Sequence, residues 1–145
     1  MSKIPVMLRI RSVQTYEGQD PDVIELMTEG TLDHRNSVWE LTYEESDLTG
    51  LEGVTTTFKV SKRGATIRRS GKLNSRMIFR EGVRHESLYQ MELGALMISV
   101  TAQKIRYDMT EQGGTVEITY AIEIEQSAAG KVEYRLEVTP IGTTA

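Results

Sequence analysis

The sequence predicts an all-β protein: residues 1–145 form one domain, a single antiparallel up-and-down β-barrel of about 8–10 strands. The first observation is a strict alternation of apolar and polar residues, clearest at 115–126 and 131–140. Successive strand side chains point to opposite faces, so this period of two indicates one buried and one wet face. The second observation is that glycine-containing turns separate the alternating runs. The third is length, because 145 residues bury a full core without disulfides or metal.

The first part of the chain predicts four strands, at 4–15, 23–32, 37–45 and 53–61. Asp20-Pro21-Asp22 marks the first turn, since proline and aspartate favour turn conformations. Residues 44–52 are the longest irregular stretch, and we expect one short helical turn there. Trp39 shares the apolar face of the third strand and is expected at the barrel floor.

The remainder predicts six strands, at 65–71, 75–80, 83–91, 95–108, 115–126 and 131–140. The breaks between them place glycine where a hairpin needs a positive φ, at Gly64, Gly82, Gly94, Gly113–Gly114 and Gly130. Short connections make consecutive strands antiparallel neighbours. A twisted sheet of this many strands tends to close because closure removes its edges. A two-sheet sandwich has the same period and remains an alternative.

Composition and motifs limit the kinds of functional site that we expect in this chain. The chain has no cysteine, which excludes disulfides and cysteine-based metal sites. His34 and His85 lie far apart in sequence without clustered acids, so we expect no metal and no cofactor. We find no nucleophile elbow and no glycine-rich phosphate loop, which favours a protein that is not an enzyme. The start lacks the continuous apolar run of a signal peptide and no stretch is long enough for a membrane helix, so a cytoplasmic location is expected.

Charge is divided unevenly along the chain. From Lys59 to Arg84 there are nine basic residues and one acid, a segment of +8 in a chain of −4, which leaves −12 for the rest. The basic surface that we predict comprises Lys62, Arg63, Arg68, Lys72, Arg76, Arg80 and Arg84. It indicates either an anionic partner or pairing with acids of neighbouring strands or of a second copy. Few aromatic residues accompany it, which disfavours nucleic acid, and we favour a homodimer of basic face against acidic face.

Arg69 differs from the other basic residues because it shares parity with Ala65 and Ile67, on the inward face. A buried arginine must be paired or bind an anion. One hypothesis is a barrel mouth where Arg69 anchors a carboxylate or phosphate beside four tyrosines; these are Tyr43, Tyr89, Tyr107 and Tyr120. The other is that Arg69 pairs with an internal carboxylate such as Glu45.

Several short motifs recur in a fixed order: Tyr43-Glu44-Glu45 before Gly53, Thr56 and Thr57; Ile67-Arg68-Arg69-Ser70-Gly71; Met77-Ile78-Phe79 with Gly82; Tyr89 with Gly94; Thr101; and Tyr120. Together they resemble the YwiB-like family of bacterial proteins, a domain of unknown function described as a calycin-like (lipocalin-like) β-barrel. The resemblance covers nearly the whole chain, with Met91 standing where threonine is expected. It implies the barrel and a cytoplasmic setting, supplies no catalytic residues, and suggests ligand binding only by analogy of fold.

Two functions follow as expectations. The first is a non-catalytic barrel that binds small anionic or amphipathic ligands in its interior or mouth, around Arg69. The alternative is a protein or nucleic-acid interaction module that uses the basic surface of residues 59–84. The size of the interior cavity distinguishes them, because a barrel filled by side chains leaves no room for a ligand.

Overall fold

A computed structural model describes residues 3–16, 18–46, 51–91, 93–125 and 127–141. These residues form ten β-strands and no helix, and the strands are β1 (Ile4–Thr15), β2 (Asp22–Arg35), β3 (Val38–Glu44), β4 (Val54–Ser61), β5 (Gly64–Gly71), β6 (Ser75–Phe79), β7 (Arg84–Met91), β8 (Gly94–Thr110), β9 (Gly113–Ile124) and β10 (Ser127–Pro140). All of them belong to one antiparallel sheet in the order β6-β5-β4-β3-β2-β1-β10-β9-β8-β7. The predicted all-β antiparallel barrel is therefore confirmed.

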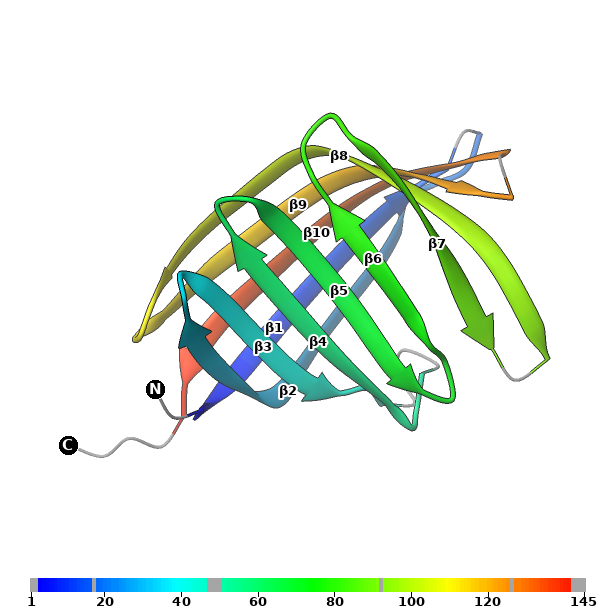
Figure 1. Cartoon of the computed structure of the whole chain (residues 1–145). Coiled ribbons are helices and arrows are strands. Elements are labelled where there is room, and N and C mark those ends of the chain that lie inside the picture. The colour runs from blue at the N-terminus through cyan, green and yellow to red at the C-terminus, as the bar shows by residue number, and fades with distance from the viewer. Residues whose placement is uncertain (1–2, 17, 47–50, 92, 126, 142–145) are drawn as a thin grey trace.

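The sheet curls into a nearly closed barrel because its first and last strands are neighbours. β1 pairs with β10 in a continuous register from Val6 opposite Pro140 to Thr15 opposite Lys131. In Figure 1, β4, β5 and β6 pass in front of β8, β9, β10 and β1 and cross them steeply. The remaining seam lies between β6 and β7, which meet through isolated bridges at Asn74–Gln90 and Arg80–Val83. Between these bridges the described residues form no ladder.

The connections explain why the strands begin and end where they do. Asn36 and Ser37 join β2 to β3 with φ values of 51° and 66°. This two-residue turn with both φ positive matches the twist of a hairpin, and asparagine tolerates it well. β2 consequently extends to Arg35, beyond the predicted end at residue 32, and contains His34. The expected helical turn at 44–52 falls mainly on residues 47–50, which lie outside the described residues.

Side chains of the inward face fill one half of the barrel. Large side chains there are less than 2% exposed, among them Phe58, Phe79, Leu8, Leu32, Leu41, Ile118 and Leu136. Trp39 is also buried at this end, and its ring stacks on His34 with centroids 3.7 Å apart. The other half of the barrel is hollow, which sets the position of the candidate site. Across the described ranges, we see no helix long and apolar enough to cross a membrane.

A candidate ligand site in the barrel mouth

A cavity of about 370 Å³ occupies the hollow half of the barrel. It opens at the end where β1 leads into β2 and β7 leads into β8, as the positions of its lining residues show. The lining is mainly aliphatic and is contributed by Ile10, Ile24, Leu26, Leu51, Ile67, Met77, Leu96, Ile98, Ile122 and Ile124. Its polar members are Ser12, Gln14, Glu45, Arg69 and four tyrosines. An apolar chamber with a few converging polar groups is the usual character of a small-molecule site.

Arg69 brings a cation into this cavity. Its side chain is 15% exposed, and its Nε lies 3.8 Å from Oε2 of Glu45, whose side chain is 3% exposed. The Thr56 hydroxyl donates a hydrogen bond to the same Glu45 oxygen. The buried Arg69 Nε has no hydrogen-bond partner within the described part of the chain. Arg69 is thus neutralised by Glu45 at a long distance, and its Nε–H is left without an acceptor among the described residues.

The tyrosines add neutral hydrogen-bond donors around Arg69. The hydroxyl oxygens of Tyr43 and Tyr134 lie 3.4 Å apart. Below them, Tyr134 stacks on Phe58 and Tyr120 packs against Phe79, with ring centroids 5.9 Å and 4.7 Å apart. These two phenylalanines are fully buried and belong to the filled half of the barrel, behind the cavity-lining tyrosines.

Protonation states in the site are set mainly by burial. Burial is the main reason why the pKa values of Tyr43, Tyr120 and Tyr134 lie above their usual value. Burial alone lowers the pKa of Arg69, but nearby tyrosine oxygens and the Glu45 carboxylate outweigh it and raise that pKa. The site therefore presents one guanidinium, one acidic side chain and protonated tyrosine hydroxyls at neutral pH.

The structure brings together four of the five residues that the sequence placed at a ligand site. Arg69, Tyr43, Tyr89 and Tyr120 line the cavity, whereas Tyr107 is not among its lining residues. Tyr107 faces inward but pairs with Val116, which pairs in turn with Leu136, and both of these partners are fully buried in the filled half of the barrel. The expectation that Tyr107 shares the cavity is corrected by this position.

Tyr134 is a cavity residue that sequence reasoning did not place beside Arg69. It alternates with Val132 and Leu136, so its inward face was readable from the sequence. Its nearness to Tyr43 was not readable, because β3 and β10 are separated by β2 and β1 in the sheet. Only the curvature of the closed barrel brings their hydroxyls together.

Comparison with known proteins places the chain in a family. Residues 8–136 match the family described as Domain of unknown function (DUF1934). The chain belongs to the DUF1934 family. A solved structure with the same fold is that of the ywiB protein from Bacillus subtilis, with a TM-score of 0.87 and 26% sequence identity over 97% of this chain and 94% of that one. No curated protein matches the chain.

The family assignment agrees with the YwiB-like resemblance seen in the sequence, and it assigns no activity. The catalytic and metal chemistry of this DUF1934 domain therefore has to be judged from its own side chains. Within the described ranges, no three histidine or acidic residues gather closely enough to hold a metal ion. The polar groups of the cavity are the Arg69–Glu45 pair, four tyrosines, Ser12 and Gln14.

The predicted basic residues of this DUF1934 domain have three different surroundings. Arg68 and Arg76 point outward from β5 and β6, away from the cavity. With Lys59 they line a groove of about 670 Å³ on the outer wall. Others are spread over turns or bridges, namely Lys62, Arg63, Lys72 and Arg80. Arg84 stands apart, since it forms ion pairs with Glu86 and Glu123.

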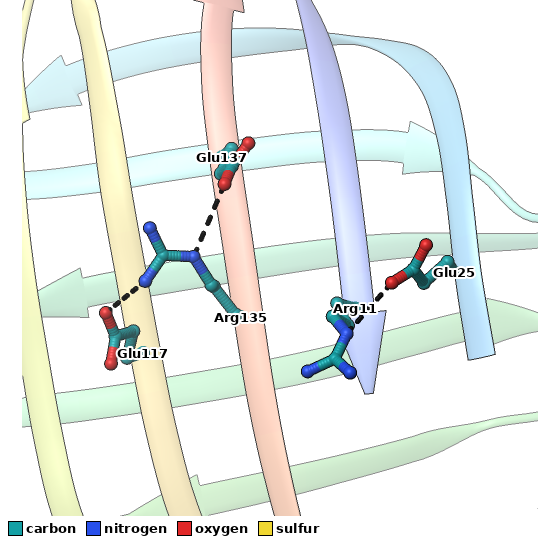
Figure 2. Close-up of polar contacts among 5 residues, drawn as sticks. All are labelled: Arg11, Glu25, Glu117, Arg135 and Glu137. Carbon is teal, nitrogen blue, oxygen red and sulfur yellow. Dashed lines mark hydrogen bonds and ion pairs between the residues drawn. The ribbon is translucent and has the colours of Figure 1, made fainter. Parts of the chain in front are cut away.

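The wall formed by β9, β10, β1 and β2 is different because its charges pair with one another. Figure 2 shows Arg135 between Glu117 and Glu137, and Arg11 beside Glu25. Arg11 Nε lies 2.9 Å from Glu25 Oε1. These pairs are solvent-exposed and each contributes about 0–1 kcal/mol to stability. The cations of these pairs offset part of the negative charge that the carboxylates give to this wall.

Proposed function

We propose that this barrel is a non-catalytic binding protein for a small amphipathic anion. The charged group of the ligand lies against Arg69, and its apolar part fills the aliphatic chamber. The observation that carries this proposal is the Arg69 guanidinium in the lining of an otherwise mainly apolar cavity, with its acid partner Glu45 no closer than 3.8 Å.

The charge balance of the site supports a ligand with an anionic group. Buried polar atoms in folded proteins nearly always have a partner, and an exception calls for a physical explanation. The Glu45 contact at 3.8 Å is too long for a hydrogen bond, although it still neutralises the cation. A carboxylate or phosphate in the cavity could accept hydrogen bonds from the Arg69 guanidinium, and a charge-assisted bond to arginine is about twice as strong as a neutral one.

The size and lining of the cavity support the amphipathic character of the ligand. The volume of about 370 Å³ lies at the low end of the range of about 300–1,000 Å³ typical of small-molecule sites. Most of its lining residues are aliphatic or aromatic, and the polar groups gather around Arg69. A ligand with one charged end and a compact apolar body matches this distribution.

Calorimetric titration with decanoate, phenylpropionate and hexyl phosphate, each compared with its uncharged alcohol, tests the proposal. We expect at least one anion to bind more tightly than its alcohol. Arg69→Met combined with Glu45→Gln should weaken anion binding by about 10-fold to 100-fold, the range expected when a charged hydrogen bond is lost. This double variant removes both charges and leaves neither buried alone.

Arg106→Ala is the matched control, because Arg106 is an exposed arginine that does not line the cavity. It should leave anion binding unchanged. Native mass spectrometry of the protein purified from its own host extends the search beyond the chosen probes. The proposal fails if no probe binds and no small molecule is retained, or if Arg106→Ala weakens binding as much as the double variant.

A further inference from the structure

Two arginines stand directly opposite each other on the outer wall of the barrel. Arg68 of β5 and Arg76 of β6 are cross-strand partners, and both are exposed. Directly opposed residues of an antiparallel pair have Cα atoms about 4.5–5.5 Å apart. Like charges at this spacing destabilise a sheet. The arrangement therefore has a cost in the free protein that a bound anion would remove.

The described acids around these two arginines have other partners. Among the described residues, no ion pair within 4.0 Å involves Arg68 or Arg76. Glu40 lines the groove itself and Glu44 lies further along β3, and both have other contacts. Glu40 lies 3.7 Å from the ammonium of Lys59, and the Glu44 carboxylate accepts a hydrogen bond from the Thr55 hydroxyl.

The groove around the two arginines is lined by groups that can donate hydrogen bonds. Thr57 lies opposite Arg68 on β4, while Thr66 and Ser70 flank Arg68 on its own strand. A threonine or serine hydroxyl, an ammonium and a guanidinium are the donors that contact phosphate oxygens in proteins. We propose that this groove binds a phosphate group, held between Arg68 and Arg76 with the hydroxyls beside it.

The composition of the groove favours phosphate over an acidic protein surface. All seven lining residues are polar or charged: Glu40, Thr57, Lys59, Thr66, Arg68, Ser70 and Arg76. Protein interfaces depend on buried aromatic and apolar anchors, and this lining has none. Surfaces that contact phosphates are more polar and more positive than protein interfaces. Without aromatic side chains the groove also lacks a platform for stacking bases, so it would contact phosphates rather than unpaired bases.

The phosphate group has two possible sources, a small phosphorylated molecule or a nucleic-acid backbone. Pyrophosphate titrated by calorimetry tests the first source. A fluorescein-labelled 20-base-pair DNA duplex followed by anisotropy at about 50 mM salt tests the second. Oligoglutamate with a fluorescent label serves as the carboxylate competitor of similar charge.

The variant Arg68→Ala/Arg76→Ala should weaken binding of the responding phosphate probe by at least about tenfold, since each charged hydrogen bond contributes about 1.5–3 kcal/mol. For the duplex, the slope of log affinity against log salt should fall by about 0.9 for each phosphate contact removed. Arg9→Ala/Arg106→Ala is the matched control. Both of these arginines are exposed and have no ion pair among the described residues, so this variant changes the net charge equally elsewhere.

Stability provides a second readout that does not depend on the choice of probe. Removing two repelling arginines should leave the melting temperature unchanged or raise it, and pyrophosphate or duplex should raise that of the unmodified protein. The proposal is wrong if neither phosphate probe binds, if oligoglutamate binds as tightly, or if the control variant loses as much affinity. Binding of pyrophosphate alone identifies a small phosphorylated ligand, and binding of the duplex identifies a backbone contact.

Discussion

Arg69 and Arg68 are sequence neighbours with opposite surroundings, and a mutation of each should separate the two environments. Arg69 lies in the cavity beside Glu45, whereas Arg68 is exposed on the outer wall. Removing one partner of a buried pair costs about 3–5 kcal/mol, and the partial exposure of Arg69 places it at or below the lower end. Arg68→Ala should change stability by less than about 0.5 kcal/mol.

Urea unfolding followed by circular dichroism measures this difference in the free energy of unfolding. Arg69→Ala should unfold at a clearly lower urea concentration than Arg68→Ala. Addition of Glu45→Gln to Arg69→Ala should recover part of the loss, because the uncompensated carboxylate is removed as well. Equal midpoints for the two single variants would mean that Arg69 is not held by a buried partner.

The buried tyrosines predict a loss of stability in alkaline solution. Their pKa values are raised in the folded protein, so the folded state keeps protons that the unfolded chain releases near its ordinary tyrosine pKa of 10.0. Stability is therefore fully present below pH 10 and declines above it. Each such tyrosine lowers the free energy of unfolding by about 1.4 kcal/mol per pH unit in that range. Tyr43→Phe/Tyr134→Phe removes two hydroxyls that contact each other. Urea titrations between about pH 9 and pH 11 should show that the free energy of unfolding falls less steeply with pH in this variant. An unchanged slope would contradict the prediction.

For single residues, the sequence predicts which face of the sheet a side chain points to better than how far along the barrel that side chain lies. Parity alone placed Arg69 inside and Arg68 outside, and the structure agrees. Tyr107 shows the limit, because a residue with the correct face can still lie near the opposite end of a long strand. The Arg69–Glu45 contact was one of two open interpretations, and the structure shows this pair inside a cavity, while anion binding by Arg69 stays a prediction.

Among the strands, two glycines near the starts of β8 and β9 are needed for reasons that mutations can separate. Gly114 has a φ of +150°, and a Cβ at this position would lie 1.9 Å from the carbonyl oxygen of Asp108. Gly94 begins β8 with nearly the same φ, +148°, but nothing lies within 4 Å of its Cβ position. Both sites impose a backbone strain of about 1–3 kcal/mol on alanine, while only Gly114 adds a clash between strands.

Gly114→Ala should therefore lower the melting temperature more than Gly94→Ala, and Gly94→Ala serves as the control for backbone strain alone. Differential scanning calorimetry measures both. Similar losses would mean that the β8–β9 pair shifts to accommodate the methyl group.

Most strand positions could be predicted from the sequence, whereas the seam between β6 and β7 could not. Alternation and glycine turns located all ten strands, with ends that differ by a few residues. The turn at Asn36-Ser37 was not signalled by glycine, so the end of β2 was placed too early. The pairing of β1 with β10 and the gap between β6 and β7 depend on contacts between distant segments, which local pattern does not encode.

For the whole molecule, the sequence divides the charge into a positive segment and a negative remainder. The fold changes how strongly this division should attract two copies to each other. Carboxylates on the wall of β9, β10, β1 and β2 are already within ion-pair distance of cations of the same chain. On the wall of β5 and β6, Arg68 and Arg76 have no such acid among the described residues. The attraction between two copies is therefore weaker than the sequence charges suggest.

This distribution predicts how the homodimer expected from the sequence should behave. Sedimentation velocity at an ionic strength of about 20 mM, where surface charges are screened little, is the most favourable condition for contact between oppositely charged faces. We expect a single chain of 16.3 kDa under these conditions, because the acidic wall is largely paired within itself.

A larger species that dissociates in about 0.3 M salt would instead support the homodimer, since contacts between surface charges weaken with salt. Arg68→Glu would then decide whether the outer groove is the contact, because reversing its charge should abolish that species and leave a dimer held by the barrel mouth unaffected.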